Sequence, residues 1–167
     1  MKLNLGASYP AGKYRKGWIN ADILRHDRIQ VVADGTLLPF KDNVFTEAHC
    51  VHVLEHLTRE KQLPMLKELY RVVERGAAVF IEVPNFIATC GAILRAWKNS
   101  DYEQVRIWTV SVYGKSERDG MAHHWGFNTV YMEELIKKVG FSSFEYPEEM
   151  ISPHHKLEPV LLIKAIK

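Results

Sequence analysis

The chain has 167 residues, of which 47% are apolar and 25% charged, and a formal net charge of +2. This length predicts one domain over residues 1–167 with a buried core, and the small charge argues against a nucleic-acid partner. Cys50 and Cys90 lie far apart, and no apolar run approaches the roughly 18 residues of a membrane span, so we expect free thiols, no membrane segment and a cytoplasmic location.

The predicted elements alternate between strands and helices along the chain. We expect strands over residues 2–6, 17–23, 28–35, 46–53, 75–84, 141–146 and 159–167, and helices over 59–73 and 128–141. The strand at 75–84 is a near-continuous apolar run, which is typical of a strand buried on both faces. Asn128 and Gly140 suit the start and end of the second helix. The alternation predicts an α/β fold with a largely parallel sheet.

Two connections depart from a regular alternation. The run "ASYPAGKYRKGW" joins the first two strands and contains Pro10, Gly12 and Gly17, which argue against a long helix. We therefore expect a shortened first crossover. The segment from about 86 to 127 is predicted to be the least regular part of the chain.

Three residues at strand ends predict a nucleoside pocket. Gly6 ends the first strand, Asp22 the second and Asp34 the third, and ligands bind at the carboxyl ends of strands in open α/β sheets. A carboxylate at Asp22 can accept from both hydroxyls of a ribose, and one at Asp34 can accept from an exocyclic amine such as that of adenine. A single acid here is commonly a turn cap, but two after consecutive strands favour an adenosine pocket. The pyrophosphate fingerprint G-x-G-x-x-G is absent.

Several motifs resemble the compact class I S-adenosylmethionine-dependent methyltransferases. They are "LNLGAS", "GWINADI", "VADGTLLPFKDNVFTEAHCVHVLEHL", "LKELYRVVERGAAVFIEVPNF" and "HHWGFNTVYMEELIKKVGF". The resemblance implies a Rossmann-like α/β sandwich whose mostly parallel seven-stranded sheet has the order 3-2-1-4-5-7-6, with the last strand antiparallel and no N-terminal cover helices. The departures are "GAS", which lacks a second glycine, and Arg75–Gly76–Ala77, where the family has Pro-Gly-Gly.

The resemblance also implies a cofactor, S-adenosylmethionine, with S-adenosylhomocysteine as product, and a role for each matched residue. The methionine part is assigned to Leu5, Gly6 and Ala7, the ribose to Asp22 with Ile23, the adenine to Asp34, Gly35 and Thr36, and the region of the sulfonium to Val51 and His52.

Histidines supply the catalytic candidates. His123 precedes Gly-Phe and is either a general base or a histidine hydrogen-bonded at a helix start, and His52 is a second candidate. The residue types of "HVLEH" would allow a metal, but we expect none, with Glu55 and His56 orienting the loop after the fourth strand. In this family the segment over 86–127 often forms part of the site for the methyl acceptor. The aromatic residues in or beside it either line that site or belong to the core, and core is the favoured interpretation for each of Trp97, Trp108, Tyr113 and Trp125.

The sequence therefore predicts a methyltransferase acting on a small-molecule, glycan or natural-product acceptor. One alternative is a cofactor-binding domain without transferase activity that acts as a regulator or partner. Another is a protein or nucleic-acid methyltransferase, although nucleic acid is disfavoured by the small charge. The shortened first crossover would leave apolar surface beside the first strand, which predicts either a homodimer or a "YPAGKYRKGW" loop folded over it.

Overall fold

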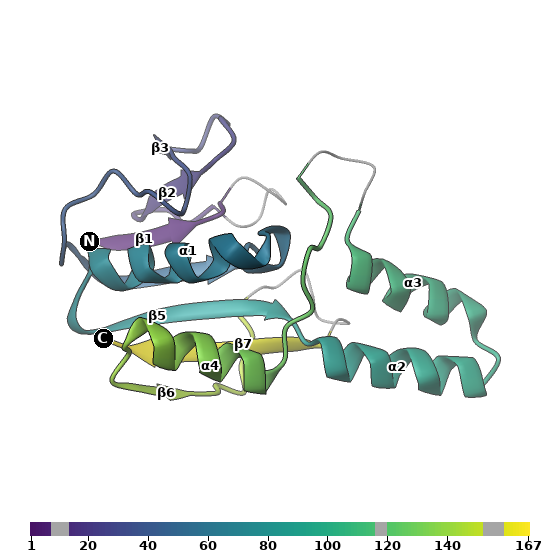
Figure 1. The fold of residues 1–167 in the computed structure, drawn as a ribbon. Helices are drawn as coiled ribbons and strands as arrows, with labels where there is room; N and C mark the ends of the chain where they lie inside the picture. Colours follow the sequence, from purple (N-terminus) through teal and green to yellow (C-terminus); the bar gives the residue numbers. More distant parts are fainter. Residues whose placement is uncertain (8–13, 116–119, 152–158) are drawn as a thin grey trace.

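The computed structural model describes residues 1–7, 14–115, 120–151 and 159–167, and within them seven strands form one sheet (Figure 1). The strands are β1 Lys2–Leu5, β2 Ile19–Asp22, β3 Val31–Val32, β4 Phe45–Val51, β5 Val73–Pro84, β6 Ser143–Glu145 and β7 Val160–Ile166. The helices are the 3-10 turn η1 Leu54–His56, α1 Arg59–Val72, α2 Phe86–Lys98, α3 Tyr102–Tyr113 and α4 Thr129–Val139.

The strand order is β3-β2-β1-β4-β5-β7-β6, which confirms the order implied by the family resemblance. Strands β1 to β5 pair in parallel, and β7 runs antiparallel to both of its neighbours, β5 and β6. The third strand has two residues where eight were predicted. The ladder to β2 starts at Val31, and before it Gln30 pairs with Asn20 through its backbone N–H and through its side-chain oxygen, which accepts from the N–H of Asn20 at 2.8 Å.

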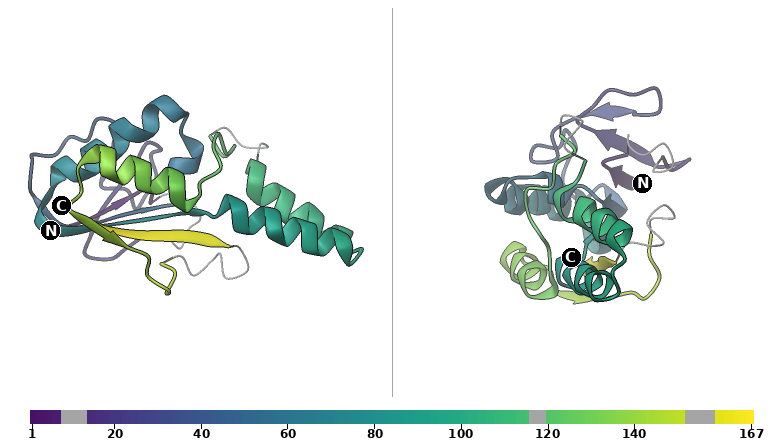
Figure 2. Two further views of the ribbon diagram at one scale, coloured as in Figure 1. Left: turned by 60° about the horizontal axis from the view of Figure 1, so that its bottom comes forward. Right: turned by 90° about the vertical axis from the view of Figure 1, so that its right-hand side faces the viewer.

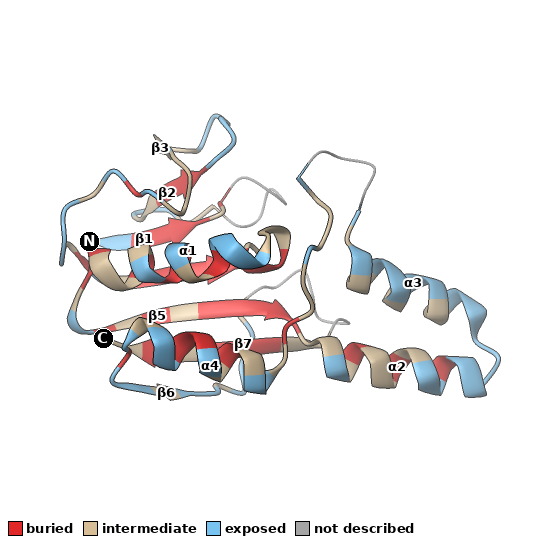
Figure 3. Ribbon diagram, viewed as in Figure 1, coloured by how far each residue is buried: buried red, intermediate tan, exposed pale blue. Residues whose placement is uncertain are grey.

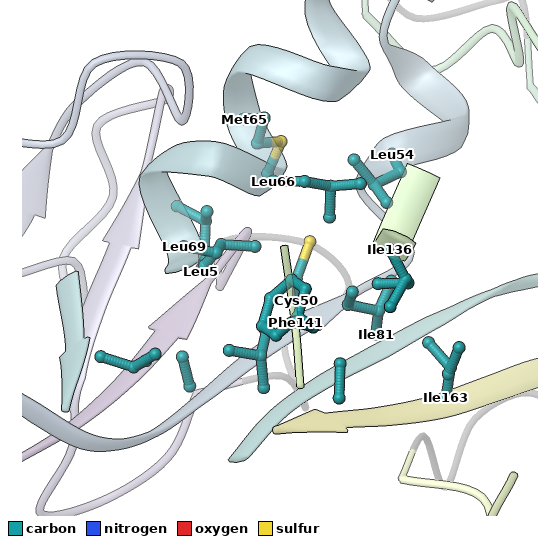
Figure 4. Close-up of a cluster of buried hydrophobic side chains, with 14 of the residues drawn as sticks. Leu5, Cys50, Leu54, Met65, Leu66, Leu69, Ile81, Ile136, Phe141 and Ile163 are labelled. Carbon is teal, nitrogen blue, oxygen red and sulfur yellow. The ribbon is translucent and has the colours of Figure 1, made fainter. Parts of the chain in front are cut away.

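The apolar core lies between one face of the sheet and the two helices α1 and α4, which pack on the same side (Figures 2 and 4). The sheet contributes alternate residues of its central strands, as the two-residue period of a strand requires, among them Leu3, Leu5, Ala48, Cys50, Val79, Ile81, Val83 and Ile163. The helices contribute Met65, Leu66 and Leu69 from α1 and Met132, Leu135 and Ile136 from α4. Of the two cysteines, both free, Cys50 is buried in this core and Cys90 is half-buried.

The opposite face of the sheet carries no helix among the described residues, and its side chains are polar and aromatic (Figure 2). The amide of Asn4 donates to Asn20 at 2.8 Å. The ring of His49 lies between Trp18 and Phe80, with centroid distances of 4.6 and 4.8 Å. The expectation that β5 is buried on both faces is thus wrong for its middle, since Phe80 is half-exposed.

His49 is a buried titratable group of this second face. Its Nε2 lies 2.8 Å from a carboxylate oxygen of Glu47. Burial and the nearby Arg15 charge lower the pKa of His49 to about 4, against the opposing effect of Glu47. The neutral imidazole is therefore the form that the folded protein holds at neutral pH.

Among the described residues, the strand positions of β1 on the face without helices are Lys2 and Asn4, which are polar, so β1 itself does not supply the apolar surface that motivated a homodimer. The first half of the loop expected to cover that surface, residues 9–13, lies outside the described residues. Its described remainder, residues 14–18, contains no helix, as the shortened crossover requires.

Helix α4 has the ends that the sequence predicts. The Asn128 side chain accepts from the backbone N–H of Tyr131 at 3.0 Å, and Gly140 ends the helix in the left-handed conformation with φ of 100°. Lys137 and Lys138 occupy the last turn, where cations complement the helix dipole.

The prediction of an irregular segment over 86–127 is wrong, because α2 and α3 occupy most of it as a helical hairpin beyond the carboxyl end of the sheet (Figure 1). Asn85 and Asp101 cap the two helices by accepting from backbone N–H groups. Helix α3 buries no residue (Figure 3). Trp97 and Tyr113 are exposed by 61% and 67%, so the interpretation as core is wrong for these two, whereas Trp108 is half-buried and Trp125 packs against the core.

No helix among the described residues has both the length and the apolar character needed to cross a membrane.

Candidate functional site

The carboxyl ends of β1 and β2 meet at one edge of the sheet. Leu5 ends β1, and the backbone N–H groups of Gly6 and Ala7 donate to the carbonyl of Ala21 at 2.9 and 3.3 Å. Gly6 has a φ of 79°, in the region that favours glycine. The chain therefore turns away from the sheet directly after β1, with Asp22 of β2 one residue beyond the carbonyl that holds the turn.

The fold itself requires a glycine at position 6, whether or not a ligand is bound. A Cβ placed on Gly6 would overlap the side chain of Val53, which follows β4. The missing side chain at Gly6 therefore makes room for Val53 of the same chain. No sequence pattern predicts this contact, because Gly6 follows β1 and Val53 follows β4.

Asp22 is buried, and its Oδ1 accepts from the backbone N–H of Leu24 at 2.8 Å. This bond is the turn cap that an acid at a strand end commonly makes. Beside it the apolar side chains of Ile23 and Leu24 are exposed by 64% and 60%. A buried carboxylate with exposed apolar neighbours suits a ligand that has hydroxyl groups and an apolar face.

Asp34 has a similar arrangement after β3. Its Oδ1 accepts from both the backbone N–H and the hydroxyl of Thr36, at 2.9 and 2.8 Å, and these bonds lower the pKa of Asp34. Gly35 packs against Met65, whose Sδ would lie 3.3 Å from a Cβ at that position. Leu37 is 77% exposed nearby. Asp34 is thus a fixed, ionised acceptor next to an apolar surface.

His52 follows β4 and is held among carboxylates. Val51 is the last residue of β4, and His52 takes a φ of 51° while its backbone N–H donates to the carbonyl of Glu82 at 2.8 Å. Its Nδ1 lies 3.0 Å from Oε1 of Glu55, and its Nε2 lies 3.4 Å from Oε1 of Glu82. The ring is buried, and each of its two nitrogens lies near a carboxylate of the protein.

Glu55 is the centre of a histidine-rich cluster. It is 1% exposed, and ligand atoms of Glu55, His56 and His123 all lie within 4.8 Å of one another. Burial acts to raise the pKa of Glu55, but the hydrogen bond from His52 and the charges of His52, His56 and His123 together lower it to about 2. The carboxylate is consequently ionised.

The chain segment before α4 crosses η1 and brings His123 to this cluster. The backbone N–H of His124 donates to the carbonyl of Glu55 at 2.7 Å, and Nδ1 of His56 lies 3.1 Å from the carbonyl of Ala122. The rings of His56 and His123 are 4.9 Å apart in an edge-to-face arrangement. Two contacts thus fix the segment over the carboxyl end of β4.

A small hollow beside His123 separates this cluster from the α2–α3 hairpin. It is lined by the end of β5, by both helices and by the segment before α4, through residues that include Pro84, Thr89, Ser111 and Trp125. Trp125 also packs against the core, and Arg59 lies over its ring at 4.4 Å from the centroid. Among the described residues, His123 is the one histidine that lines this hollow.

The predicted site residues fall into two groups at one edge. Leu5, Gly6, Ala7, Asp22, Ile23, Asp34, Gly35 and Thr36 lie at the ends of β1, β2 and β3, and Val51, His52 and His123 lie at or above the end of β4. Sequence reasoning missed Val53 and Glu82, and it gave Glu55 only a loop-orienting role. The spacing of His52 and Glu55 by three residues was the available signal.

Residues 15–81 match a family model described as a methyltransferase domain. No curated protein sequence matches the chain. Among similar solved structures, a SAM-dependent methyltransferase from Archaeoglobus fulgidus is 14% identical with a TM-score of 0.66, covering 99% of this chain and 85% of that one. A SAM-dependent methyltransferase from Thermotoga maritima, described as a possible histamine N-methyltransferase, is 19% identical with a TM-score of 0.61, covering 99% and 81%.

A third similar structure is 1,6-didemethyltoxoflavin-N1-methyltransferase from Burkholderia thailandensis, which holds 1,6-didemethyltoxoflavin and S-adenosylhomocysteine. It is 12% identical with a TM-score of 0.59, and the match covers 99% of this chain and 70% of that one. At these identities the likeness is one of fold.

Proposed function

Because the chain has the class I S-adenosylmethionine-dependent methyltransferase fold and matches the methyltransferase domain family over residues 15–81, we propose that it transfers the methyl group of S-adenosylmethionine to a small-molecule, glycan or natural-product acceptor. The observation that carries this proposal is the pair of carboxylates, Asp22 and Asp34, at adjacent strand ends beside Gly6.

The carboxylates, the apolar side chains and the glycine at this edge of the sheet suit the cofactor. In this proposal Asp22 accepts from the ribose hydroxyls and Asp34 from the adenine amine, and both carboxylates are held by bonds from their own loops. The exposed side chains of Ile23 and Leu37 offer apolar surface to the adenine. Gly6 and Ala7 lie at the end of β1, where the methionine part would pass close to the backbone.

The bound cofactor supplies an electrophilic methyl group on a positively charged sulfur. The acceptor atom forms its bond to this carbon as the carbon–sulfur bond breaks, and the electron pair stays on sulfur, leaving S-adenosylhomocysteine. The protein's part is to hold the acceptor in line, since positioning alone supplies much of the rate.

His123 is the residue that we assign to the acceptor's proton. Its Nδ1 lies 2.9 Å from the carbonyl of Ser111, and a carbonyl can only accept, so Nδ1 carries a hydrogen and, in the neutral ring, Nε2 carries the lone pair. The ring borders the small hollow beside α2 and α3, on the side of the site that we assign to the acceptor. His52 supports the site from within through Glu55 and Glu82.

The test is transfer of a labelled methyl group from S-adenosylmethionine to a panel of hydroxyl and amine acceptors. We expect His123→Ala to lower turnover by about 10²- to 10⁴-fold while S-adenosylhomocysteine binds as before. His124→Ala is the matched control and should keep full turnover, because the exposed His124 contacts the cluster through its backbone.

Two results would contradict this proposal. Cofactor binding without transfer to any acceptor would favour a cofactor-binding domain that acts as a regulator or partner. Equal losses of turnover in His123→Ala and His124→Ala would remove the specific assignment to His123.

A further inference from the structure

Glu55, His56 and His123 form a set of potential metal ligands at the acceptor side of the site. Their ligand atoms all lie within 4.8 Å of one another. Ligand bonds to zinc of about 2.0–2.1 Å place tetrahedral ligand atoms roughly 3.3 Å apart. Small rotations of these side chains would therefore close the set around one ion.

The two histidines are oriented as metal ligands usually are. Nδ1 of His56 lies 3.1 Å from the carbonyl of Ala122, and Nδ1 of His123 lies 2.9 Å from the carbonyl of Ser111. Each Nδ1 must be the donor, so the neutral rings present their Nε2 lone pairs. A histidine that binds a metal through one nitrogen typically donates its other N–H to a backbone carbonyl or carboxylate.

Glu55 supplies an independent observation that points to a cation. Its side chain is 1% exposed, and its Oε1 is bound by His52. Its Oε2 is buried and has no hydrogen-bond partner among the described residues. A buried carboxylate oxygen without a partner is costly, and a cation at the centre of the cluster would satisfy it.

We propose that Glu55, His56 and His123 bind one divalent transition-metal ion that holds an oxygen of the methyl acceptor, an assignment that rests on the proposed function. Two imidazoles and one carboxylate suit Zn²⁺, Co²⁺ or Fe²⁺ better than Mg²⁺, and they leave coordination positions open. This proposal replaces the expectation from sequence that the site holds no metal.

The ion gives the acceptor hydroxyl a second route to ionisation. A hydroxyl bound to the ion loses its proton to water more readily than a free one. The resulting oxygen forms the bond to the methyl carbon as the carbon–sulfur bond breaks. Nε2 of His123 cannot bind the ion and accept the proton at once, so the ligand and base roles of His123 are alternatives that experiment separates.

The test is titration of chelator-treated protein with Zn²⁺, and in parallel with Mg²⁺, by calorimetry, with visible absorption of added Co²⁺ as a second readout. We expect one Zn²⁺ per chain and much weaker binding of Mg²⁺. His56→Ala and His123→Ala should each weaken Zn²⁺ binding at least about tenfold. His26→Ala and His124→Ala, at exposed histidines, should leave it unchanged.

Failure to bind Zn²⁺ in a one-to-one ratio, or equal affinity in wild type and His56→Ala, would overturn the ion site. His56 is half-exposed, so its variant tests the site even if replacing the buried Glu55 prevents folding. S-adenosylhomocysteine titrated into the same samples separates the two proposals. Cofactor binding without Zn²⁺ binding overturns the ion site alone, and Zn²⁺ binding without cofactor binding supports the ion site while contradicting the proposed function.

Discussion

Replacing Gly6 by alanine should destabilise the protein even when no ligand is present. Gly6 has a φ of 79°, and a Cβ there would overlap the side chain of Val53. The same φ occurs at Gly17, where φ is 81° and nothing lies within 4 Å of the Cβ position. Gly17→Ala is therefore a matched control that has the backbone strain without the overlap.

The two variants should differ by the cost of the overlap. A non-glycine residue in the left-handed region costs about 1–2 kcal/mol, which is the loss of unfolding free energy that we expect for Gly17→Ala. Overpacking adds about 1–3 kcal/mol, so Gly6→Ala should lose about 2–5 kcal/mol. In a Val53→Ala background the added alanine at Gly6 should cost only the strain.

The assay is urea unfolding of the four proteins and the double variant, each without cofactor, at one temperature. A coupling of about 1–3 kcal/mol between positions 6 and 53 is expected from the overlap. The reasoning is refuted if Gly6→Ala and Gly17→Ala lose the same stability. It is also refuted if Val53→Ala recovers none of the difference.

Three further predictions concern stability. The pKa of His49 in the folded protein is about 4, below its ordinary value, so on acidification the unfolded chain binds a proton first, and the free energy of unfolding should fall by about 3 kcal/mol between pH of about 6.5 and about 4. Unfolding of His49→Gln across this range should depend less on pH, and a pH dependence equal to that of the wild type would contradict the assignment. Arg71→Met should lose about 1.5–3 kcal/mol in urea unfolding, because Arg71 pairs with Glu68 at 2.7 Å and donates to the carbonyl of Leu38 at 3.0 Å. Asn128→Ala should lose about 1 kcal/mol through its helix cap, and a thermal melt indistinguishable from wild type would count against that role.

Local signals predict the elements that pack on the sheet. Helix α4 has a cap at Asn128, a glycine stop at Gly140 and one apolar face, and its structure follows them closely. The strand order came from a family resemblance, because local patterns do not specify which strands pair. The length of β3 could not be predicted, since Gln30, just before it, pairs with Asn20 partly through its side chain.

The α2–α3 hairpin could not be predicted from the same signals. Gly91 and β-branched residues such as Thr89 and Val105 lower helix propensity in this segment. Helix α3 buries no side chain, so it has no apolar stripe imposed by a sheet. Its start at Asp101 is a cap that sequence reasoning could have used.

The part of the candidate site that each strand positions by itself could be predicted from the sequence. Asp22 ends β2 as expected, whereas Asp34 lies two residues after the end of β3. The cluster of Glu55, His56 and His123 could not be predicted, because His123 reaches η1 only through the segment that crosses it. Contacts of this kind depend on tertiary structure and leave no periodic pattern.

Calorimetric titration with S-adenosylhomocysteine tests the account's central claim most directly. We predict one bound molecule per chain for the wild type, and binding weaker by about 10- to 150-fold in Asp22→Ala, since a lost charged hydrogen bond costs about 1.5–3 kcal/mol. Asp27→Ala, at an exposed position in the following loop, should bind as the wild type does. No binding by the wild type, or equal binding by a folded Asp22→Ala, would contradict the account.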